Sequence, residues 1–218
     1  IIKDTSELDN LCDLAVRALD EIIDYQNYPV LAAEKSTKAR RSLGIGYIGL
    51  AHYLAKNKLK YHDKEAAMMV NILTEKFQFA LLKASNNLAK EKGKCDYFDR
   101  TKYADGILPI DTYKKDIDEI VGSKYTCNWE KLRKDMKTGL RHSTLSAQMP
   151  SESSSVVGNA TNGIEPPRGY LSIKKSKKGP LKQIVPEYSR LKNFYTLLWD
   201  MPGNEGYINI VGAMQKYF

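Results

Sequence analysis

Apolar side chains recur at helical spacing in two long stretches of the chain. The first stretch begins at Leu8 and predicts an amphipathic helix that ends near Pro29. The second predicts a long helix over residues 64–92, which ends at Gly93. Each helix is expected to turn one face towards a core. The apolar stripe of the second helix consists of Val70, Leu73, Phe77, Leu81, Ala84 and Leu88.

Shorter elements are predicted in the rest of the chain. A loose basic connection leads to a short strand over residues 40–47 and then to a helix over 50–55. A second short strand over residues 143–149 ends at Pro150, and residues 170–174 and 181–185 read as a β-hairpin. Because helices separate the strands, the pattern favours an α/β fold that is rich in helix. Further helices are expected over 112–121, with Asp111 as the cap, and over 129–136, 191–199 and 207–218.

Composition narrows the class of protein. With 218 residues, 42% of them hydrophobic and 28% charged, the chain is long enough to bury a core. The chain contains no run of about 18 apolar residues, which is the length that would predict a transmembrane helix. The 3 cysteines are too scattered for a disulfide framework, and neither they nor the 3 histidines have the spacing of a metal site. We therefore expect a cytoplasmic protein with no membrane contact and no bound metal.

The basic residues are concentrated in two segments. The chain has 34 Lys+Arg against 26 Asp+Glu, a net charge of +8, and the excess lies mainly in residues 31–62 and 168–192. The tip of the predicted hairpin, residues 174–179, would suit phosphate groups, so a basic module that binds nucleic acid is the alternative function. A solvated tip that protects a sheet edge explains the same residues, and only Tyr170 is near enough in sequence to offer an aromatic surface for bases.

A glycine pattern at residues 44–49 matches G-x-G-x-x-G. In a dinucleotide site these glycines would let backbone N–H groups approach a pyrophosphate. The segment before Gly44 is basic rather than a buried apolar strand, and no second strand precedes Asp63, the acidic residue in the region that would bind a ribose. Close packing between a strand and a helix is the favoured interpretation of these glycines.

A hydroxyl-rich turn follows the second predicted strand. Pro150, Ser151, Glu152, Ser153 and Ser154 lie where this strand ends and a helix begins. Free backbone N–H groups, the positive end of a helix dipole and several hydroxyl donors suit such a turn to an anion. Ordinary capping of the helix by one serine explains the same pattern. The spacing therefore leaves an anion site and a capped helix both open.

Several segments together resemble one family, the large (α) subunit of class I ribonucleotide reductase, and most closely its bacterial and bacteriophage branch. The most specific part is Pro-Ser-Glu-Ser-Ser-Ser at 150–155 with the loop that continues to Tyr170. The segments that carry the resemblance are 14–20, 24–29, 40–46, 82–91, 106–113, 143–155, 159–170, 199–204 and 214–216.

This resemblance implies a fold and a site. Residues 1–218 would form a single C-terminal portion of the family's catalytic domain, which is a ten-stranded α/β barrel. The enzyme reduces ribonucleoside diphosphates to 2′-deoxyribonucleoside diphosphates by thiyl-radical chemistry. In the family, the turn that matches residues 150–154 binds the diphosphate of the substrate. Ser153 stands where many members have threonine, a change that keeps the hydroxyl.

The catalytic cysteines of the family have no match in this chain. None of Cys12, Cys95 or Cys127 lies in an Asn-x-Cys-x-Glu loop, and no Tyr-Tyr pair is present. We therefore expect a piece of a longer or split polypeptide that contains no catalytic residue and is inactive alone. The implied partners are the remaining α segments, a β subunit, a second α subunit and the ribonucleoside diphosphate, but no nucleic acid. No cofactor is expected on this chain, because the complete enzyme depends on a diiron–tyrosyl radical in the β subunit and on nucleoside triphosphate effectors.

Overall fold

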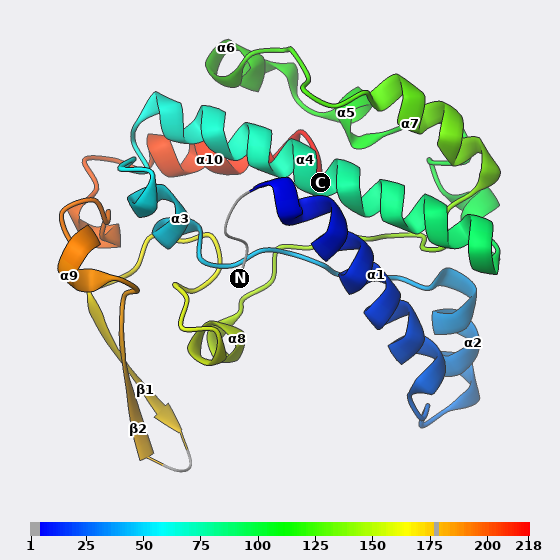
Figure 1. The fold of residues 1–218 in the computed structure, drawn as a ribbon, viewed down its shortest axis with the longest axis horizontal. Helices are drawn as coiled ribbons and strands as arrows, with labels where there is room; N and C mark the ends of the chain where they lie inside the picture. Colours follow the sequence, from blue (N-terminus) through cyan, green and yellow to red (C-terminus); the bar gives the residue numbers. More distant parts are fainter. Residues whose placement is uncertain (1–4, 177–178) are drawn as a thin grey trace.

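A single long helix organises the molecule. The computed structural model describes residues 5–176 and 179–218, and α4 (Lys64–Lys92) crosses most of its width (Figure 1). Two other helices, α1 (Leu8–Tyr25) and α10 (Glu205–Gln215), pack along α4. The predicted long helix is confirmed at both ends, since α4 stops at Gly93, whose φ of 87° is a backbone conformation that glycine adopts without strain.

Two apolar cores lie on α4. The first core packs α1 against the C-terminal half of α4 and includes Val16, Leu81 and Trp129. The second core packs the N-terminal part of α4 against α10 and includes Val70 and Ile210. Because α4 contributes to both cores, it is buried on more of its circumference than the single predicted stripe.

The shorter helices agree in part with the sequence pattern. The predicted helices over 50–55 and 129–136 are confirmed, and so is the helix after the serine-rich turn. The single helix predicted over 112–121 is wrong in detail, because the structure has two short helices there, over Pro109–Thr112 and Asp118–Val121. Asp111 is not the residue before a helix: it lies inside the first of them, and its carboxylate accepts a hydrogen bond from Leu108 N–H (2.7 Å). The short helices are α2 (Leu31–Arg40), α3 (Leu50–Lys56), α5 (Pro109–Thr112), α6 (Asp118–Val121), α7 (Trp129–Asp135), α8 (Glu152–Val157) and α9 (Tyr188–Leu191).

Two other predictions fail, one for a local reason and one because of a tertiary contact. The expected basic connection after Pro29 is the helix α2, which buries no residue and carries the pair Glu34–Lys38 one helical turn apart at 2.7 Å. The expected helix over 191–199 is instead the end of α9 and a 3₁₀ turn over Leu198–Asp200. Here Leu198 N–H donates to Pro167 O at 2.9 Å, a tertiary bond that replaces a helical one.

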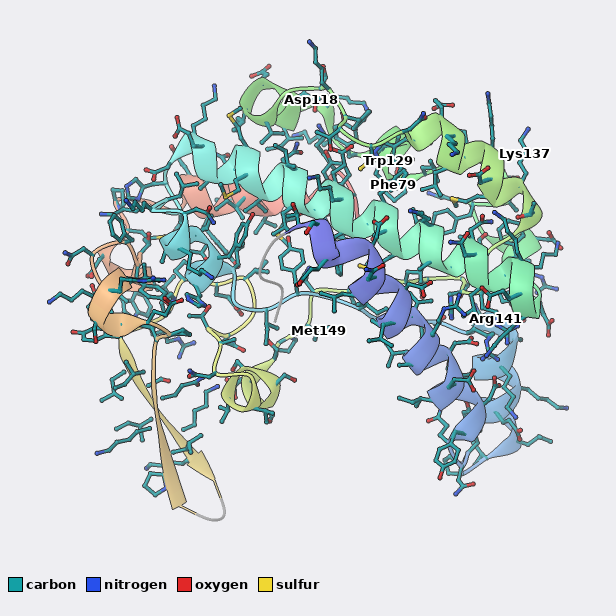
Figure 2. The ribbon with its side chains drawn as sticks, viewed as in Figure 1. Phe79, Asp118, Trp129, Lys137, Arg141 and Met149 are labelled. Carbon is teal, nitrogen blue, oxygen red and sulfur yellow. The ribbon has the colours of Figure 1, made fainter. Side chains whose placement is uncertain are left out.

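A buried carboxylate on α4 organises the loop before α7. Glu75 is fully buried and accepts hydrogen bonds from the N–H groups of Thr126 and Cys127 (both 2.8 Å) and from the Trp129 indole (3.1 Å). The indole also meets Phe79 edge to face, with ring centroids 5.4 Å apart (Figure 2). Glu75 is therefore a structural residue that fixes the start of α7.

Two extended segments run side by side through the centre. Residues 43–47 and 143–147 are parallel, with hydrogen bonds from Leu43 N–H to Thr144 O (3.0 Å) and from Ile45 N–H to Leu145 O (2.9 Å). The strands predicted over 40–47 and 143–149 are thus present only as extended segments, which are joined by one isolated β-bridge, Ile45 to Ser146. Parallel strands that are separated by helices agree with the predicted α/β class.

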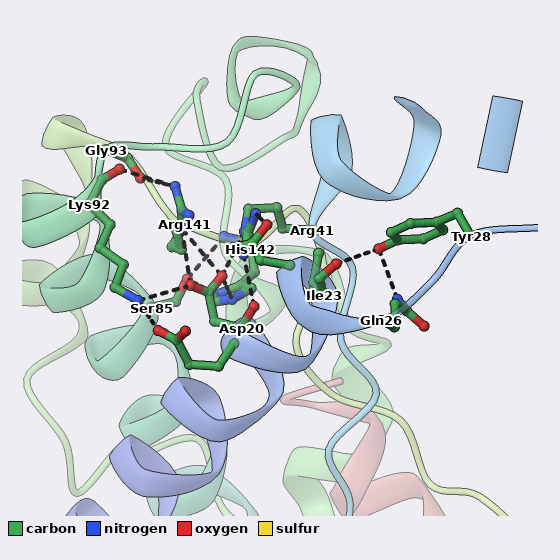
Figure 3. Close-up of polar contacts among 12 residues, drawn as sticks. Asp20, Ile23, Gln26, Tyr28, Arg41, Ser85, Lys92, Gly93, Arg141 and His142 are labelled. Carbon is green, nitrogen blue, oxygen red and sulfur yellow. Dashed lines mark hydrogen bonds and ion pairs between the residues drawn. The ribbon is translucent and has the colours of Figure 1, made fainter. Parts of the chain in front are cut away.

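A buried network of charges holds the beginnings of both extended segments (Figure 3). Asp20 of α1 is fully buried, and its Oδ1 lies 2.6 Å from Arg41 Nε and 3.2 Å from both Arg141 Nε and His142 Nε2. Burial raises the pKa of Asp20, but the hydrogen bond from Arg41 and the charges of Arg141 and Arg41 outweigh it and keep this pKa below its ordinary value. Since Arg41 precedes one segment and Arg141 the other, the network sets where both segments begin.

The predicted hairpin is confirmed. Strands β1 (Leu171–Ser176) and β2 (Gly179–Ile184) pair antiparallel, with Leu171 opposite Ile184, and the hairpin projects away from α4 and α10 (Figure 1). Lys177 and Lys178 of its basic tip lie outside the described residues. No helix in the described ranges is long and apolar enough to cross a membrane.

Candidate functional site

The predicted anion turn lies where the second extended segment ends. Residues 143–147 lead through Met149, near the middle of the molecule (Figure 2), into the turn and α8. The first extended segment leads in the same direction into α3. Both parallel segments therefore direct their carboxyl ends, and the turns that follow them, to one side of the molecule.

Ser151 is used to build the turn. It is 6% exposed, its Oγ accepts a hydrogen bond from Gly163 N–H (3.1 Å), and it donates to Asn162 Oδ1 (3.3 Å). The same Gly163 accepts through its carbonyl oxygen from Gly49 N–H (3.0 Å) and Leu50 N–H (3.3 Å). Ser151 thus joins the turn to the loop 159–165 and, through that loop, to the start of α3.

Ser153 and Ser154 are oriented differently. Both are exposed, as are Pro150 and Glu152, and their hydroxyls bond to no residue that the structure describes. The first backbone bond of α8 is from Ser155 N–H to Ser151 O (2.8 Å), so the N–H groups of residues 152–154 have no acceptor within the helix. The site residues therefore present two hydroxyls and three backbone N–H groups together. With only six residues in α8, these donors matter more than the helix dipole.

Three buried polar atoms around the turn lack a partner. Gln148 Nε2, Thr161 Oγ1 and Glu165 Oε2 have no hydrogen-bond partner among the described residues. Buried polar groups are nearly always paired in folded proteins, so these three atoms have capacity for further hydrogen bonds close to the turn.

The glycines at 44–49 pack the two extended segments together. A Cβ on Gly46 would lie 2.2 Å from Ala147 O, so only glycine fits this close approach. The N–H groups of Gly49 and Leu50, which would face a pyrophosphate in a dinucleotide site, are bonded to Gly163 O. The geometry supports tight packing and not a dinucleotide fingerprint.

The cysteines are held as thiols. Burial raises the pKa of Cys12 to about 12 and that of Cys127 to about 11, with the Glu75 charge adding to the second shift. Cys12 and Cys95 are buried and belong to the first core. In residues 5–176 and 179–218, no group of three or more His, Cys, Asp or Glu side chains could hold a metal ion.

The sequence pattern did not indicate that the hairpin contacts the site. Lys174 Nζ lies 2.8 Å from Glu152 O, and Gln183 Nε2 lies 3.1 Å from Ser155 O. The sequence places Lys174 in the basic tip and Gln183 in the second strand of the predicted hairpin, and no spacing relates either residue to α8.

Comparison with known proteins identifies the family. Residues 2–217 match the family described as the ribonucleotide reductase barrel domain. The chain belongs to this family. The resemblance carried by the serine-rich turn and its neighbouring segments is therefore confirmed, and the parallel extended segments, with helices between them, form part of the reductase α/β barrel.

The relatives are α subunits from bacteria and bacteriophage. The chain is 59% identical over 204 residues to the ribonucleoside-diphosphate reductase subunit alpha of Haemophilus influenzae, covering 93% of this chain and 27% of the relative. It is 57% identical over 196 residues to the ribonucleoside-diphosphate reductase 1 subunit alpha of Escherichia coli, covering 89% and 26%. The subunit alpha of Enterobacteria phage T4 is 46% identical over 218 residues, covering 99% and 28%. The chain thus spans little more than a quarter of the length of these reductase subunits.

Proposed function

We propose that this chain supplies part of the catalytic barrel of a ribonucleoside-diphosphate reductase α subunit. The complete enzyme would reduce ribonucleoside diphosphates to 2′-deoxyribonucleoside diphosphates by thiyl-radical chemistry, in the cytoplasm. In this proposal residues 1–218 form one portion of the barrel domain, and residues 150–154 bind the diphosphate of the substrate. The observation that carries the site is the set of unbonded hydroxyls and N–H groups at Ser153 and Ser154, placed at the end of a barrel strand.

The chemistry of the turn suits a diphosphate. Phosphate oxygens accept several hydrogen bonds at once, and bonds to a charged acceptor contribute about 1.5–3 kcal/mol each. The hydroxyls of Ser153 and Ser154 and the N–H groups of residues 152–154 would supply these bonds, while Ser151 holds the loop 159–165 behind them. The two extended segments pack closely at Gly46, against the backbone of Ala147, and this close packing fixes the position of the turn.

The radical chemistry would come from other segments of the complete enzyme. No cysteine here lies in the family's Asn-x-Cys-x-Glu loop, so the thiyl, the general base and the redox pair would be supplied by the remaining α segments. The one-electron oxidant would come from the diiron–tyrosyl site of a β subunit, and nucleoside triphosphates would act as effectors on an α dimer. None of the residues described here is assigned a step in that chemistry beyond binding the substrate.

The diphosphate assignment is tested by removing the two hydroxyls. In the complete α subunit, the double variant Ser153→Ala/Ser154→Ala should weaken binding of cytidine 5′-diphosphate by at least about 100-fold, because two bonds of about 1.5–3 kcal/mol each to a charged group are lost. Isothermal titration with the diphosphate and with cytidine measures this, and cytidine binding should change little. The matched control Ser189→Ala removes an exposed hydroxyl on α9. Unchanged diphosphate affinity in the double variant would show that the turn does not bind the substrate.

A separate experiment tests the proposal that other α segments supply the radical chemistry. The 218-residue chain mixed with β subunit and a dithiol should reduce no ribonucleoside diphosphate, because it contains none of the family's radical cysteines. Product formation is followed by chromatography of the deoxynucleotides. Turnover without any other α segment would contradict this proposal.

A further inference from the structure

We propose that Lys174 and Gln183 of the hairpin are positioning residues for the diphosphate turn. This inference rests on the function proposed above and extends it to a second element. In this proposal the hairpin holds the first turn of α8 in the conformation that binds the substrate, and the substrate affinity depends on these two polar contacts.

The hairpin turns Lys174 and Gln183 towards the molecule, on a face that also carries Leu181, which is 44% exposed. Lys174 and Gln183 are half-buried. Leu171, Ile173 and Ile184, on the opposite face of the two strands, are 51%, 58% and 53% exposed. A hairpin usually buries its apolar face, whereas here every leucine and isoleucine of the two strands is at least 44% exposed, so apolar packing contributes little and the polar contacts fix this hairpin.

Those polar contacts all end on α8 and the residues beside it. Lys174 Nζ donates to Glu152 O (2.8 Å) and to Ser155 Oγ (3.2 Å). Gln183 Nε2 donates to Ser155 O and to Ala160 O, both at 3.1 Å. Glu152 lies between Ser151 and Ser153, so the Lys174 contact falls within the proposed diphosphate turn itself.

Helix α8 has few other attachments. Its one buried residue is Ser155, Val157 is 89% exposed, and none of its described residues belongs to either core. On one side Ser151 ties the turn to the loop 159–165, and on the other side Lys174 and Gln183 tie the helix to the hairpin. Without apolar anchors, a six-residue helix depends on such hydrogen bonds for its position.

Both donors act on the turn through its backbone. Lys174 and Gln183 bond carbonyl oxygens, which leaves the hydroxyls of Ser153 and Ser154 and the nearby N–H groups free for the ligand. The ammonium group of Lys174 also brings a positive charge next to a site proposed for an anion. Loss of either contact should therefore lower substrate affinity and leave the chemical step unchanged.

The experiment separates binding from chemistry. In the complete α subunit assembled with its β partner, Lys174→Met and Gln183→Leu should each raise KM for cytidine 5′-diphosphate about 3- to 10-fold, the effect of one net hydrogen bond, with kcat within twofold. Lys174→Arg keeps a donor and a charge and should restore most of the KM. A residue that merely stabilises the fold would lower the yield of active enzyme and leave KM unchanged, so that result would overturn the inference.

Two further sets of variants make the test specific. Lys175→Met and Lys182→Met remove the same charge from the exposed opposite face of the hairpin and should leave KM unchanged. Lys174→Met added to Ser153→Ala/Ser154→Ala should raise KM by less than its separate effect, because the turn would no longer need precise positioning.

The outcomes distinguish this inference from the function beneath it. If the double serine variant raises KM and neither Lys174→Met nor Gln183→Leu does, the positioning role is wrong and the diphosphate turn stands. If the double serine variant leaves KM unchanged, the diphosphate assignment itself is wrong. If Lys174→Met and Lys175→Met raise KM equally, the overall charge of the hairpin explains the change, and this result would also contradict the inference.

Discussion

His142 shows how a buried network controls the protonation of one residue. Its ring lies between Asp20 (Nε2 to Oδ1, 3.2 Å) and Ser85 (Nδ1 to Oγ, 2.9 Å), and it is fully buried. Burial lowers the pKa of His142 to about 4, and the positive charges of Arg41 and Arg141 act in the same direction, against the attraction of Asp20. The imidazole is therefore neutral at neutral pH.

This protonation state predicts a loss of stability in acid. A histidine in the unfolded chain has a pKa near 6.5, whereas the pKa of His142 in the folded protein is about 4. Between these two pH values the unfolded state binds one more proton than the folded state, which favours unfolding. Stability should fall by about 2 kcal/mol between pH 7 and pH 5 because of His142 alone. Urea unfolding at the two pH values measures the change. In His142→Asn this part of the loss should disappear; an unchanged pH dependence in the variant would contradict the assignment.

A second prediction at this scale concerns the buried carboxylate Glu75. It accepts hydrogen bonds from two backbone N–H groups and an indole, so Glu75→Gln would turn an amide NH₂ towards donors. Glu75→Gln should therefore cost about 2–3 kcal/mol of unfolding free energy. Glu34→Gln, the same change in the exposed pair with Lys38, should cost less than about 0.5 kcal/mol. Similar values for both variants would show that burial of Glu75 does not matter.

The serine-rich turn illustrates what single residues reveal in a sequence. The hydroxyl-rich pattern at 150–154 predicted a turn that opens a helix, and the structure confirms that local geometry. The pattern could not show that the Ser151 hydroxyl is hydrogen-bonded to Asn162 and Gly163, while the hydroxyls of Ser153 and Ser154 have no partner among the described residues. That division depends on loop residues 11 and 12 positions further along the chain. The role of the turn in binding the substrate remains a prediction.

At the scale of elements, local periodicity predicted the long helices because their own side chains determine them. The stripe from Val70 to Leu88 lies on α4, whose ends match the predicted ones. Helix α2 has no apolar stripe and buries no residue, so its periodicity does not predict a helix. The segment after α9 was predicted as helix, but a bond to Pro167, distant in sequence, determines its conformation.

The hairpin marks another limit of sequence patterns. Its two strands were predicted from composition and are confirmed. Its orientation was not predicted, because aliphatic residues at alternating positions normally mark the buried face, and here Ile173 and Ile184 are exposed. Only the acceptors on α8, which lie outside the hairpin, determine that Lys174 and Gln183 face inwards.

The glycine contact between the extended segments yields a prediction for this pair of elements. Gly46→Ala would place a Cβ 2.2 Å from the backbone oxygen of Ala147, so the two segments must separate. Overpacking of this kind costs about 1–3 kcal/mol. Gly44→Ala is the matched control, since its Cβ would lie 3.4 Å from the Ala147 side chain, an ordinary contact. Thermal unfolding of both variants measures the difference, and equal midpoints would contradict the packing argument.

At the scale of the whole molecule, α1 exposes an apolar stripe on the face opposite its core contacts. Leu14, Ile22 and Tyr25 are 65%, 52% and 91% exposed, while Val16 and Ile23 on the other face are buried. Exposed apolar stripes of this kind are typical of interaction surfaces. We expect α1 of the isolated chain to associate with a second copy of the chain.

This association can be measured directly. Leu14→Lys/Ile22→Lys should shift the chain towards monomer in sedimentation velocity, because the apolar area that drives association is replaced by charge. Asn10→Lys/Asn27→Lys adds the same charge at exposed polar positions of α1 and the turn after it and serves as control. Equal dissociation by both pairs would indicate a general charge effect and would contradict a specific role for the stripe.

The parallel pair of extended segments has a consequence for amide hydrogen exchange. Leu43, Ile45 and Ala147 direct their N–H groups into the pair, whereas those of Gly44, Gly46, Ser146 and Gln148 have no acceptor among the described residues. In the chain by itself, protection should therefore alternate along residues 43–46 and, in residues 143–148, be confined to Ser143 and Ala147. When neighbouring barrel strands add to the two edges, the fast amides should become slow while the inner ones change little. The exchange rates of only four amides would then report whether, and on which edge, the barrel has been completed.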